Sequence, residues 1–169
     1  MLIININGPI NAGKTTVSKL LTEMLPDSEF VEVDDLLSDE EEEHLGLSME
    51  EGWQERVDRL EQIVFRKKSE NTCRYLIFAY PLTQGNYNRW KGYEDGQTKF
   101  VCITLSPSLQ ECLKNRGTRE LNAWELDRIR QMYQEGYHAP EFSDLIVHND
   151  NQTPNETASV VLDFLKGFL

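Results

Sequence analysis

Residues 8–15 read Gly-Pro-Ile-Asn-Ala-Gly-Lys-Thr and fit the pattern Gly-x-x-x-x-Gly-Lys-[Ser/Thr]. In this pattern the glycines let backbone amides turn toward phosphate oxygens, and the N-terminus of the following helix adds partial positive charge. Lys14 would reach the β- and γ-phosphates, and Thr15 would offer its hydroxyl to Mg²⁺. The pattern therefore predicts a loop for MgATP, whose ligand-binding residues are Gly8, Asn11, Ala12, Gly13, Lys14, Thr15 and Thr16.

Two adjacent aspartates, Asp34 and Asp35, follow the second apolar run of the chain. A phosphotransferase needs a carboxylate beside the γ-phosphate to orient or deprotonate an acceptor hydroxyl. We expect Asp34 to take this role, to contact the substrate, and to share Mg²⁺ with Thr15 through ordered waters. Asp35 is expected to cap the following turn or helix. The reverse assignment of the two carboxylates stays open.

A cluster of basic residues surrounds Gly117 in residues 114–123. The cluster contains Lys114, Arg116 and Arg119. Arginines on a mobile flap can neutralise charge on a transferring phosphoryl group and expel water. Arg116 and Arg119 are therefore catalytic candidates on a predicted lid, and the alternative is a solvated loop with ordinary surface charges.

The elements that must position these residues follow an α/β alternation. Short apolar runs occur at residues 2–6, 30–33, 75–80, 100–105 and 145–147. Runs that are apolar at nearly every position are typical of parallel strands covered on both faces. Helical stripes lie between them, with Ser-x-x-Glu and Thr-x-x-Glu capping boxes at Ser48 and Thr153. The sequence predicts a doubly wound α/β domain, and the acidic run at residues 39–43 is interpreted as a solvated loop.

The amino-acid composition disfavours some classes of binding partner. The 169 residues carry 29 acidic and 17 basic side chains, a net charge of −12 that would repel nucleic acids and anionic membranes. The three cysteines, Cys73, Cys102 and Cys112, suit reduced thiols in a cytosolic core. We see no targeting segment and no run of the length that a membrane span needs. We expect a cytoplasmic protein, a monomer or weak homodimer, that acts on a small molecule.

Absent motifs narrow the function. The chain lacks the Asn-Lys-x-Asp element with which GTPases read guanine, which disfavours a molecular switch. The third apolar run ends in Tyr80-Pro81 without the acidic residue of a Walker B motif. A kinase that uses ATP and Mg²⁺ is the favoured reading. The alternatives are an ATP-binding protein that sequesters a toxic or regulatory ligand with little turnover, and a nucleoside or nucleotide kinase.

These motifs together resemble the shikimate kinase and gluconate kinase group of P-loop kinases. The sequence is also similar to tunicamycin-resistance-type proteins, through residues 4–8, 80–83, 116–130 and 140–144. The resemblance implies a three-layer α/β/α P-loop NTPase fold with a five-stranded parallel sheet of order 2-3-1-4-5. It also implies one kinase domain over residues 1–169, with a substrate subdomain at about residues 36–72 and a lid at about residues 114–123.

The acceptor is left open. Shikimate kinases carry a triple glycine where this chain has Tyr80-Pro81-Leu82-Thr83, so the resemblance does not assign shikimate as the acceptor. Two arginines of the predicted Ser48 helix could receive an anionic substrate or lie on its polar face, and Tyr87, Arg89 and Trp90 could form a wall or pack in the core. The substrate-binding candidates are Asp34, Arg56, Arg59, Tyr80 and Arg89.

Overall fold

The computed structural model describes residues 1–115 and 119–168. At its centre is a sheet of five parallel strands in the order β2-β3-β1-β4-β5. The strands are β1 (Leu2–Asn7), β2 (Ser28–Glu32), β3 (Tyr75–Ala79), β4 (Lys99–Leu105) and β5 (Leu145–Val147). Both the predicted strands and the predicted order are confirmed.

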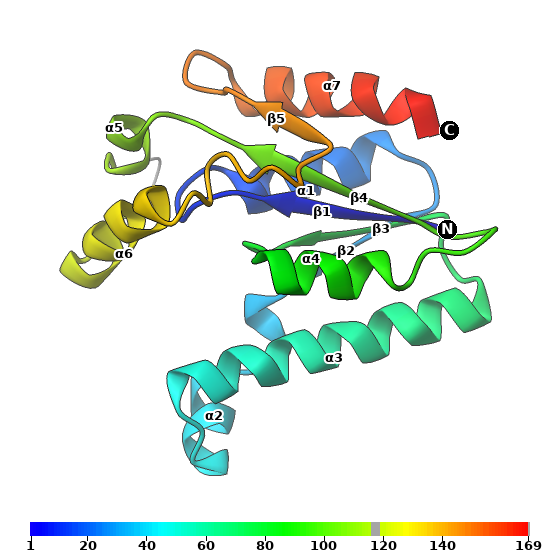
Figure 1. Cartoon of the computed structure of the whole chain (residues 1–169), viewed down its shortest axis with the longest axis horizontal. Coiled ribbons are helices and arrows are strands. Elements are labelled where there is room, and N and C mark those ends of the chain that lie inside the picture. Colours follow the sequence, from blue (N-terminus) through cyan, green and yellow to red (C-terminus); the bar gives the residue numbers. More distant parts are fainter. Residues whose placement is uncertain (116–118, 169) are drawn as a thin grey trace.

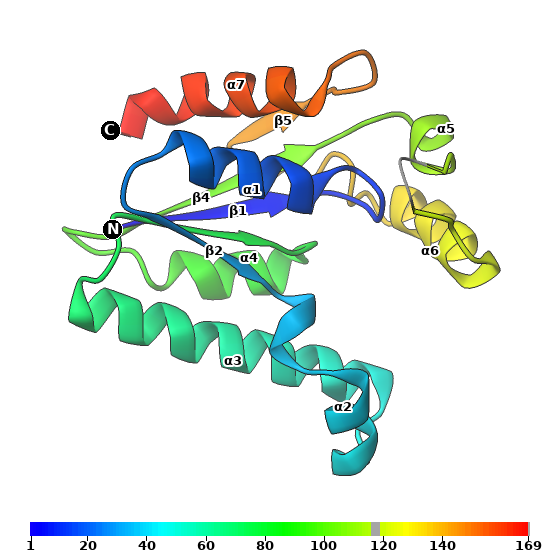
Figure 2. The same cartoon turned by 180° about the vertical axis from the view of Figure 1, so that it is seen from behind.

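Helices cover both faces of the sheet (Figures 1 and 2). The helices are α1 (Lys14–Met24), α2 (Asp39–Leu45), α3 (Met49–Glu70), α4 (Gln84–Lys91), α5 (Leu109–Cys112), α6 (Ala123–Gln134) and α7 (Pro154–Leu165), with short 3₁₀ turns η1 (Asp34–Leu36) and η2 (Lys166–Phe168). Helices α1 and α7 lie side by side on one face, and α3 and α4 lie on the other. The three-layer α/β/α fold is therefore confirmed.

Alternate residues of the central strand explain the continuous apolar runs. Leu2, Ile4 and Ile6 pack into the cluster with α1 and α7, whereas Ile3 packs into the cluster with α3 and α4. A strand whose successive side chains point to opposite buried faces must be apolar at nearly every position. The two clusters together hold the sheet between its helical layers.

The predicted capping boxes are confirmed at the starts of α3 and α7. The acidic run at residues 39–43, which we interpreted as a loop, is instead part of α2. The Ser38 hydroxyl caps this helix by accepting from the Glu41 amide, 3.2 Å away. Four acidic residues in the first turn also suit the positive end of the helix dipole.

The aromatic residues after β3 pack in the core. Trp90 is 1% exposed and contacts the rings of Phe78 and Phe100, and Tyr87 stacks on Phe142. Of the two roles considered for these rings, a substrate-facing wall and core packing, the structure shows core packing. The three cysteines, all among the described residues, are buried and not in disulfides. Within the described ranges, the structure contains no helix with the length and apolarity to cross a membrane.

Candidate active site

A cleft of about 1300 Å³ opens at the carboxyl ends of the strands. It is lined by the glycine-rich loop, by Glu32 at the end of β2, by Asp34 just after it, by Tyr80 after β3 and by Trp53 of α3. Helices α2, α5 and α6 lie at this end of the molecule (Figure 1). The crevice outside the carboxyl ends of the strands is where open parallel sheets bind ligands.

The backbone conformation of the glycine-rich loop requires glycine at position 8, and hydrogen bonds fix the loop in place. Gly8 has φ +135°, and a Cβ there would lie 2.4 Å from the carbonyl oxygen of Leu105. The Asn11 amide donates to the carbonyl oxygens of Cys112 and Lys114, both 2.8 Å away. The Asn149 amide donates to the carbonyl of Ala12 at 3.2 Å. The loop is thereby tied to the segments that follow β4 and β5.

Lys14 is held inside this loop. Its Nζ donates to the carbonyl oxygen of Pro9 at 2.7 Å. Burial lowers the pKa of Lys14 to about 8, Arg119 adds to the fall, and the negative charges of Asp34 and Glu32 oppose it. Phosphate oxygens beside Nζ would supply the negative charge that favours the protonated amine.

This environment predicts proton uptake when ATP binds. Near pH 9 the Lys14 amine is mostly neutral in the unliganded protein, so MgATP binding should take up roughly one proton. Near pH 7 the amine is already charged and uptake at this group should be small. Titration calorimetry in buffers of different ionisation enthalpy measures the proton count. A Lys14→Met variant that shows the same uptake would assign the proton to another group.

A carboxylate that the sequence analysis missed lines the same cleft as Lys14. Glu32 and Asp34 line the cleft, whereas Val33 between them is fully buried. The Thr15 side chain hydrogen-bonds to Glu32. Burial raises the pKa of Glu32, Asp34 and Asp35 add to the rise, and the Thr15 hydrogen bond opposes it. Glu32 precedes the predicted base Asp34 by only two residues, and this spacing was the available signal.

The second aspartate, Asp35, acts on Glu32 through its charge but is not part of the cleft lining. Asp35 is exposed and does not line the cleft. Helix α2 is capped by Ser38, so the expected cap role of Asp35 at that helix is not observed. The distribution of the two carboxylates favours Asp34 as the group that meets a substrate.

The oxygen donors around Thr15 suit a magnesium ion. Mg²⁺ prefers oxygen ligands and keeps several waters, so one or two protein ligands suffice. The Thr15 hydroxyl would hold the ion, and Glu32 and Asp34 would orient its waters. No larger cluster of His, Cys, Asp and Glu side chains suited to a metal ion occurs among residues 1–115 and 119–168. When bound, the ion would neutralise phosphate charge.

This arrangement predicts a metal-affinity defect for Glu32→Gln. The substitution keeps the size of the side chain but removes the charge that would orient metal-bound water. We expect the Mg²⁺ concentration for half-maximal ATP turnover to rise roughly tenfold. A magnesium titration at fixed ATP measures this, with Glu23→Gln on the exposed side of α1 as the control. Equal magnesium dependence in both variants would remove Glu32 from the metal site.

The described part of the predicted lid contributes one arginine to the cleft. Arg119 lines the cleft and pairs with Glu125, 2.6 Å from its Oε1. Lys114 pairs with Glu111. Arg116 lies outside the described residues, so its predicted catalytic role stays a prediction.

The acceptor candidates divide into two groups. Tyr80 lines the cleft, and its ring lies 5.7 Å from that of Trp53. Burial raises the pKa of Tyr80 to about 12, and Tyr137 and Asp34 add to the rise, so its hydroxyl is a neutral donor. Trp53 and Tyr137 also line the cleft, although the sequence analysis assigned neither of them a ligand role.

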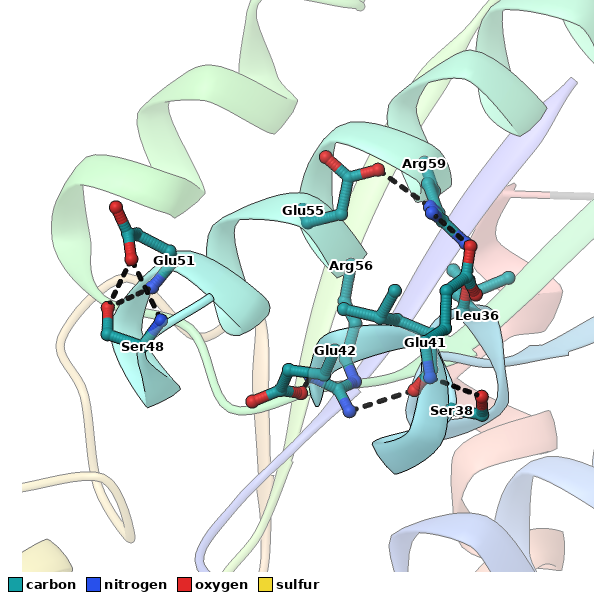
Figure 3. A network of polar contacts seen from close by, with 10 residues as sticks. Leu36, Ser38, Glu41, Glu42, Ser48, Glu51, Glu55, Arg56 and Arg59 are labelled. Carbon is teal, nitrogen blue, oxygen red and sulfur yellow. Dashed lines mark hydrogen bonds and ion pairs between the residues drawn. The ribbon is translucent and has the colours of Figure 1, made fainter. Parts of the chain in front are cut away.

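The other candidates, three arginines, are not brought to the cleft. Arg56 and Arg59 bind Glu42 and Glu41 of α2, and Arg59 also binds Glu55 (Figure 3). Arg89 pairs with Asp58 and Glu61 of α3. These guanidinium groups therefore lie along the polar face of α3 rather than in an open anion site. Any contact between them and a substrate stays a prediction.

The parallel sheet and the glycine-rich loop between β1 and α1 show that the chain has a kinase-like P-loop NTPase fold. Comparison with known proteins agrees. The sequence is 23% identical over 169 residues to the shikimate kinase of Sulfurihydrogenibium sp. (strain YO3AOP1), across 96% of this chain and 97% of that protein. No family model matches the chain.

Solved structures share the fold over nearly the whole chain. A sugar kinase from Janibacter sp. HTCC2649 has a TM-score of 0.68 and 15% identity, covering 98% of this chain and 94% of that one. The tunicamycin resistance protein of Deinococcus radiodurans has a TM-score of 0.58 and 20% identity, covering 96% and 94%. The predicted resemblance to shikimate kinases and to tunicamycin-resistance proteins is thus confirmed.

Proposed function

We propose that this protein transfers the γ-phosphoryl group of MgATP to a hydroxyl group of a small molecule. The observation that carries the proposal is that Lys14 and Asp34 line one cleft from opposite elements, the glycine-rich loop and the segment after β2. Lys14 would hold the phosphates, and Asp34 would meet the acceptor. The similarity to kinases in sequence and fold supports the same reading.

The residues define a balanced transfer step. The acceptor oxygen attacks the γ-phosphorus, and the bond from that phosphorus to the β–γ bridging oxygen breaks. ADP leaves with the electron pair, and Asp34 accepts the hydroxyl proton. Lys14 and Arg119 stabilise negative charge on the transferred group.

We assign this activity to a single domain over residues 1–169. Within it, residues 36–72 form the substrate subdomain, which contains the whole of α2 and α3. We assign the lid to residues 114–123, of which Arg119 lines the cleft. ATP is the phosphoryl donor, and Mg²⁺ is the cofactor.

A panel of acceptors tests the proposal. ADP release by the purified protein with MgATP is measured with shikimate, gluconate, nucleosides, aminoglycosides and tunicamycin, and with Lys14→Ala as the blank. We expect at least one acceptor to raise ADP release well above the rate with water. Uniformly flat rates, with ATP still raising the melting temperature as a ligand of the native state does, would favour the sequestering protein instead.

A further inference from the structure

Outside the glycine-rich loop, part of the cleft lining is an uncharged surface. We call it the acceptor wall, and it consists of Trp53, Gln54, Val57, Tyr80, Asn86 and Tyr137. Two rings, Trp53 and Tyr80, contact each other, and the negative charge of Asp34 acts on the Tyr80 hydroxyl. The wall therefore adjoins the proposed base. Aromatic rings offer flat faces for stacking, and amides offer hydrogen bonds without net charge.

The charges around this wall disfavour an anion. Among the described residues, Lys14, Arg119 and Arg128 are the cations that line the cleft. Lys14 belongs to the phosphate loop, and Arg119 pairs with Glu125. Arg128 donates to both carboxylate oxygens of Glu135, at 2.9 and 3.0 Å. The carboxylates of Glu32, Asp34 and Glu50 line the same cleft, so a negatively charged acceptor would meet like charge.

Two cations contact rings of the wall, Arg128 at Tyr137 and Arg56 at Trp53. Each is paired with a glutamate, and the partner of Arg56 comes from α2. The Arg56 guanidinium is 5.2 Å from the Trp53 ring centroid, and Arg56 is only 8% exposed. Its Nη1 donates to Glu42 at 2.7 Å, and its Nη2 donates to the carbonyl of Leu37 at 2.8 Å (Figure 3). The Glu42 carboxylate thus neutralises the Arg56 charge that lies against the Trp53 ring.

A glycine makes this pairing possible. Gly52 of α3 is buried beside Glu42, and a Cβ at this position would lie 2.5 Å from the Glu42 carboxylate carbon. Glycine in a helix interior is unfavourable by itself, so the space it leaves has a structural use. Gly52 permits the close approach of α2 that keeps Arg56 paired.

We propose that the acceptor is an uncharged or positively charged alcohol with a flat ring, and that Glu42 excludes anionic acceptors by neutralising Arg56 behind the acceptor wall. This inference rests on the proposed kinase function, because it describes the substrate of the same cleft. It distinguishes this chain from kinases whose alcohol acceptors also carry a carboxylate group. Glu42 acts as a specificity-determining residue through Arg56 and touches no reacting atom.

Three ring-matched probes test the charge preference. They are 4-(hydroxymethyl)benzamide, 4-(aminomethyl)benzyl alcohol and 4-(hydroxymethyl)benzoate, which carry zero, positive and negative charge on one scaffold. Each is titrated into the full chain saturated with Mg²⁺ and a non-hydrolysable ATP analogue, so that the phosphate loop is occupied. Binding is followed by the indole N–H signal of Trp53, assigned with Trp53→Phe. We expect the amide and the amine to bind at least about tenfold more tightly than the benzoate.

Variants of α2 and α3 test the role of Glu42. In Glu42→Gln the benzoate affinity should rise at least about fivefold while the amide affinity changes little. Gly52→Ala adds a methyl group that displaces the Glu42 carboxylate, and it should have the same effect. Glu43→Gln removes the same charge from an exposed position of α2 and should leave all three affinities unchanged.

Several results would overturn the inference. They are equal binding of benzoate and amide to the unmodified chain, equal effects of Glu42→Gln and Glu43→Gln, or no shift of the Trp53 signal with any probe. These readouts need no turnover. A failure of the charge preference is therefore distinguishable from a failure of kinase activity, which the ADP measurement reports separately.

Discussion

Asp34→Asn is expected to lower the turnover of an acceptor by about 10² to 10⁴, the range typical of losing a positioned general base. Asp34 lines the cleft after β2, on the same side as Glu32 and within electrostatic reach of Lys14. The amide keeps the shape of the side chain but cannot accept the hydroxyl proton. The affinity for ATP without Mg²⁺ should change little, because Asp34 is assigned to the acceptor and to metal-bound waters rather than to the phosphates. Initial rates of ADP formation at saturating acceptor measure the first quantity, and calorimetric titration with ATP measures the second.

The adjacent aspartate provides the matched control. Asp35 is exposed outside the cleft, so Asp35→Asn should retain nearly full turnover. An Asp34→Asn variant with normal turnover would remove Asp34 from the role of base. A large fall in Asp35→Asn alone would transfer that role to its neighbour.

Lys14→Ala is expected to lower turnover by about 10² to 10³, because a charged donor aimed at the transferred group is lost from a largely dehydrated site. ATP binding should weaken as well, since Lys14 is assigned to contact the phosphates before and during transfer. The matched control is Lys19→Ala, which removes the same charge from an exposed position of α1. Comparable losses in the two variants would indicate that net charge, not the position of the amine, explains the effect.

The pH dependence of the stability of the unliganded protein provides a second test of the environment of Lys14. Between pH 8 and the ordinary pKa of 10.5, the unfolded Lys14 binds a proton that the native one does not. Stability due to this group therefore rises with pH across that window, and at pH 7 burial of the charge opposes folding. Lys14→Met should raise the free energy of unfolding at pH 7 by on the order of 1 to 3 kcal/mol and lose this advantage above pH 10.5. Urea unfolding at both pH values measures the difference.

Much of the fold could be predicted from the sequence because the local motifs, apolar runs and capping boxes all indicated the same elements. The glycine-rich loop lies between an apolar strand and a helix, and Gly8 is required by the approach of the Leu105 carbonyl. Continuous apolar runs identified the strands of a two-sided sheet, and capping boxes located the starts of two helices. The order of the strands came from the resemblance, because periodicity alone does not say which strands are neighbours.

The acceptor region was harder to read because its features depend on contacts between distant residues. Arg56 looks like a free cation in the sequence, but Glu42, 14 residues away, pairs with it. The acidic run seemed to be a solvated loop because like charges repel, whereas two arginines of α3 stabilise it as a helix. Glu32 was missed because the end of β2 could not be located to within a residue, and one residue decides which side chains face the cleft.

The most direct test of phosphoryl transfer follows the γ-phosphoryl group itself. The protein is incubated with Mg²⁺, an acceptor from the panel and ATP labelled with ¹⁸O at the γ-phosphate, and the products are weighed by mass spectrometry. We predict one labelled phosphoryl group on the acceptor for each ADP formed, and none with Lys14→Ala. Label recovered only in inorganic phosphate, with every acceptor unchanged in mass, would contradict the assignment of this protein as a small-molecule kinase.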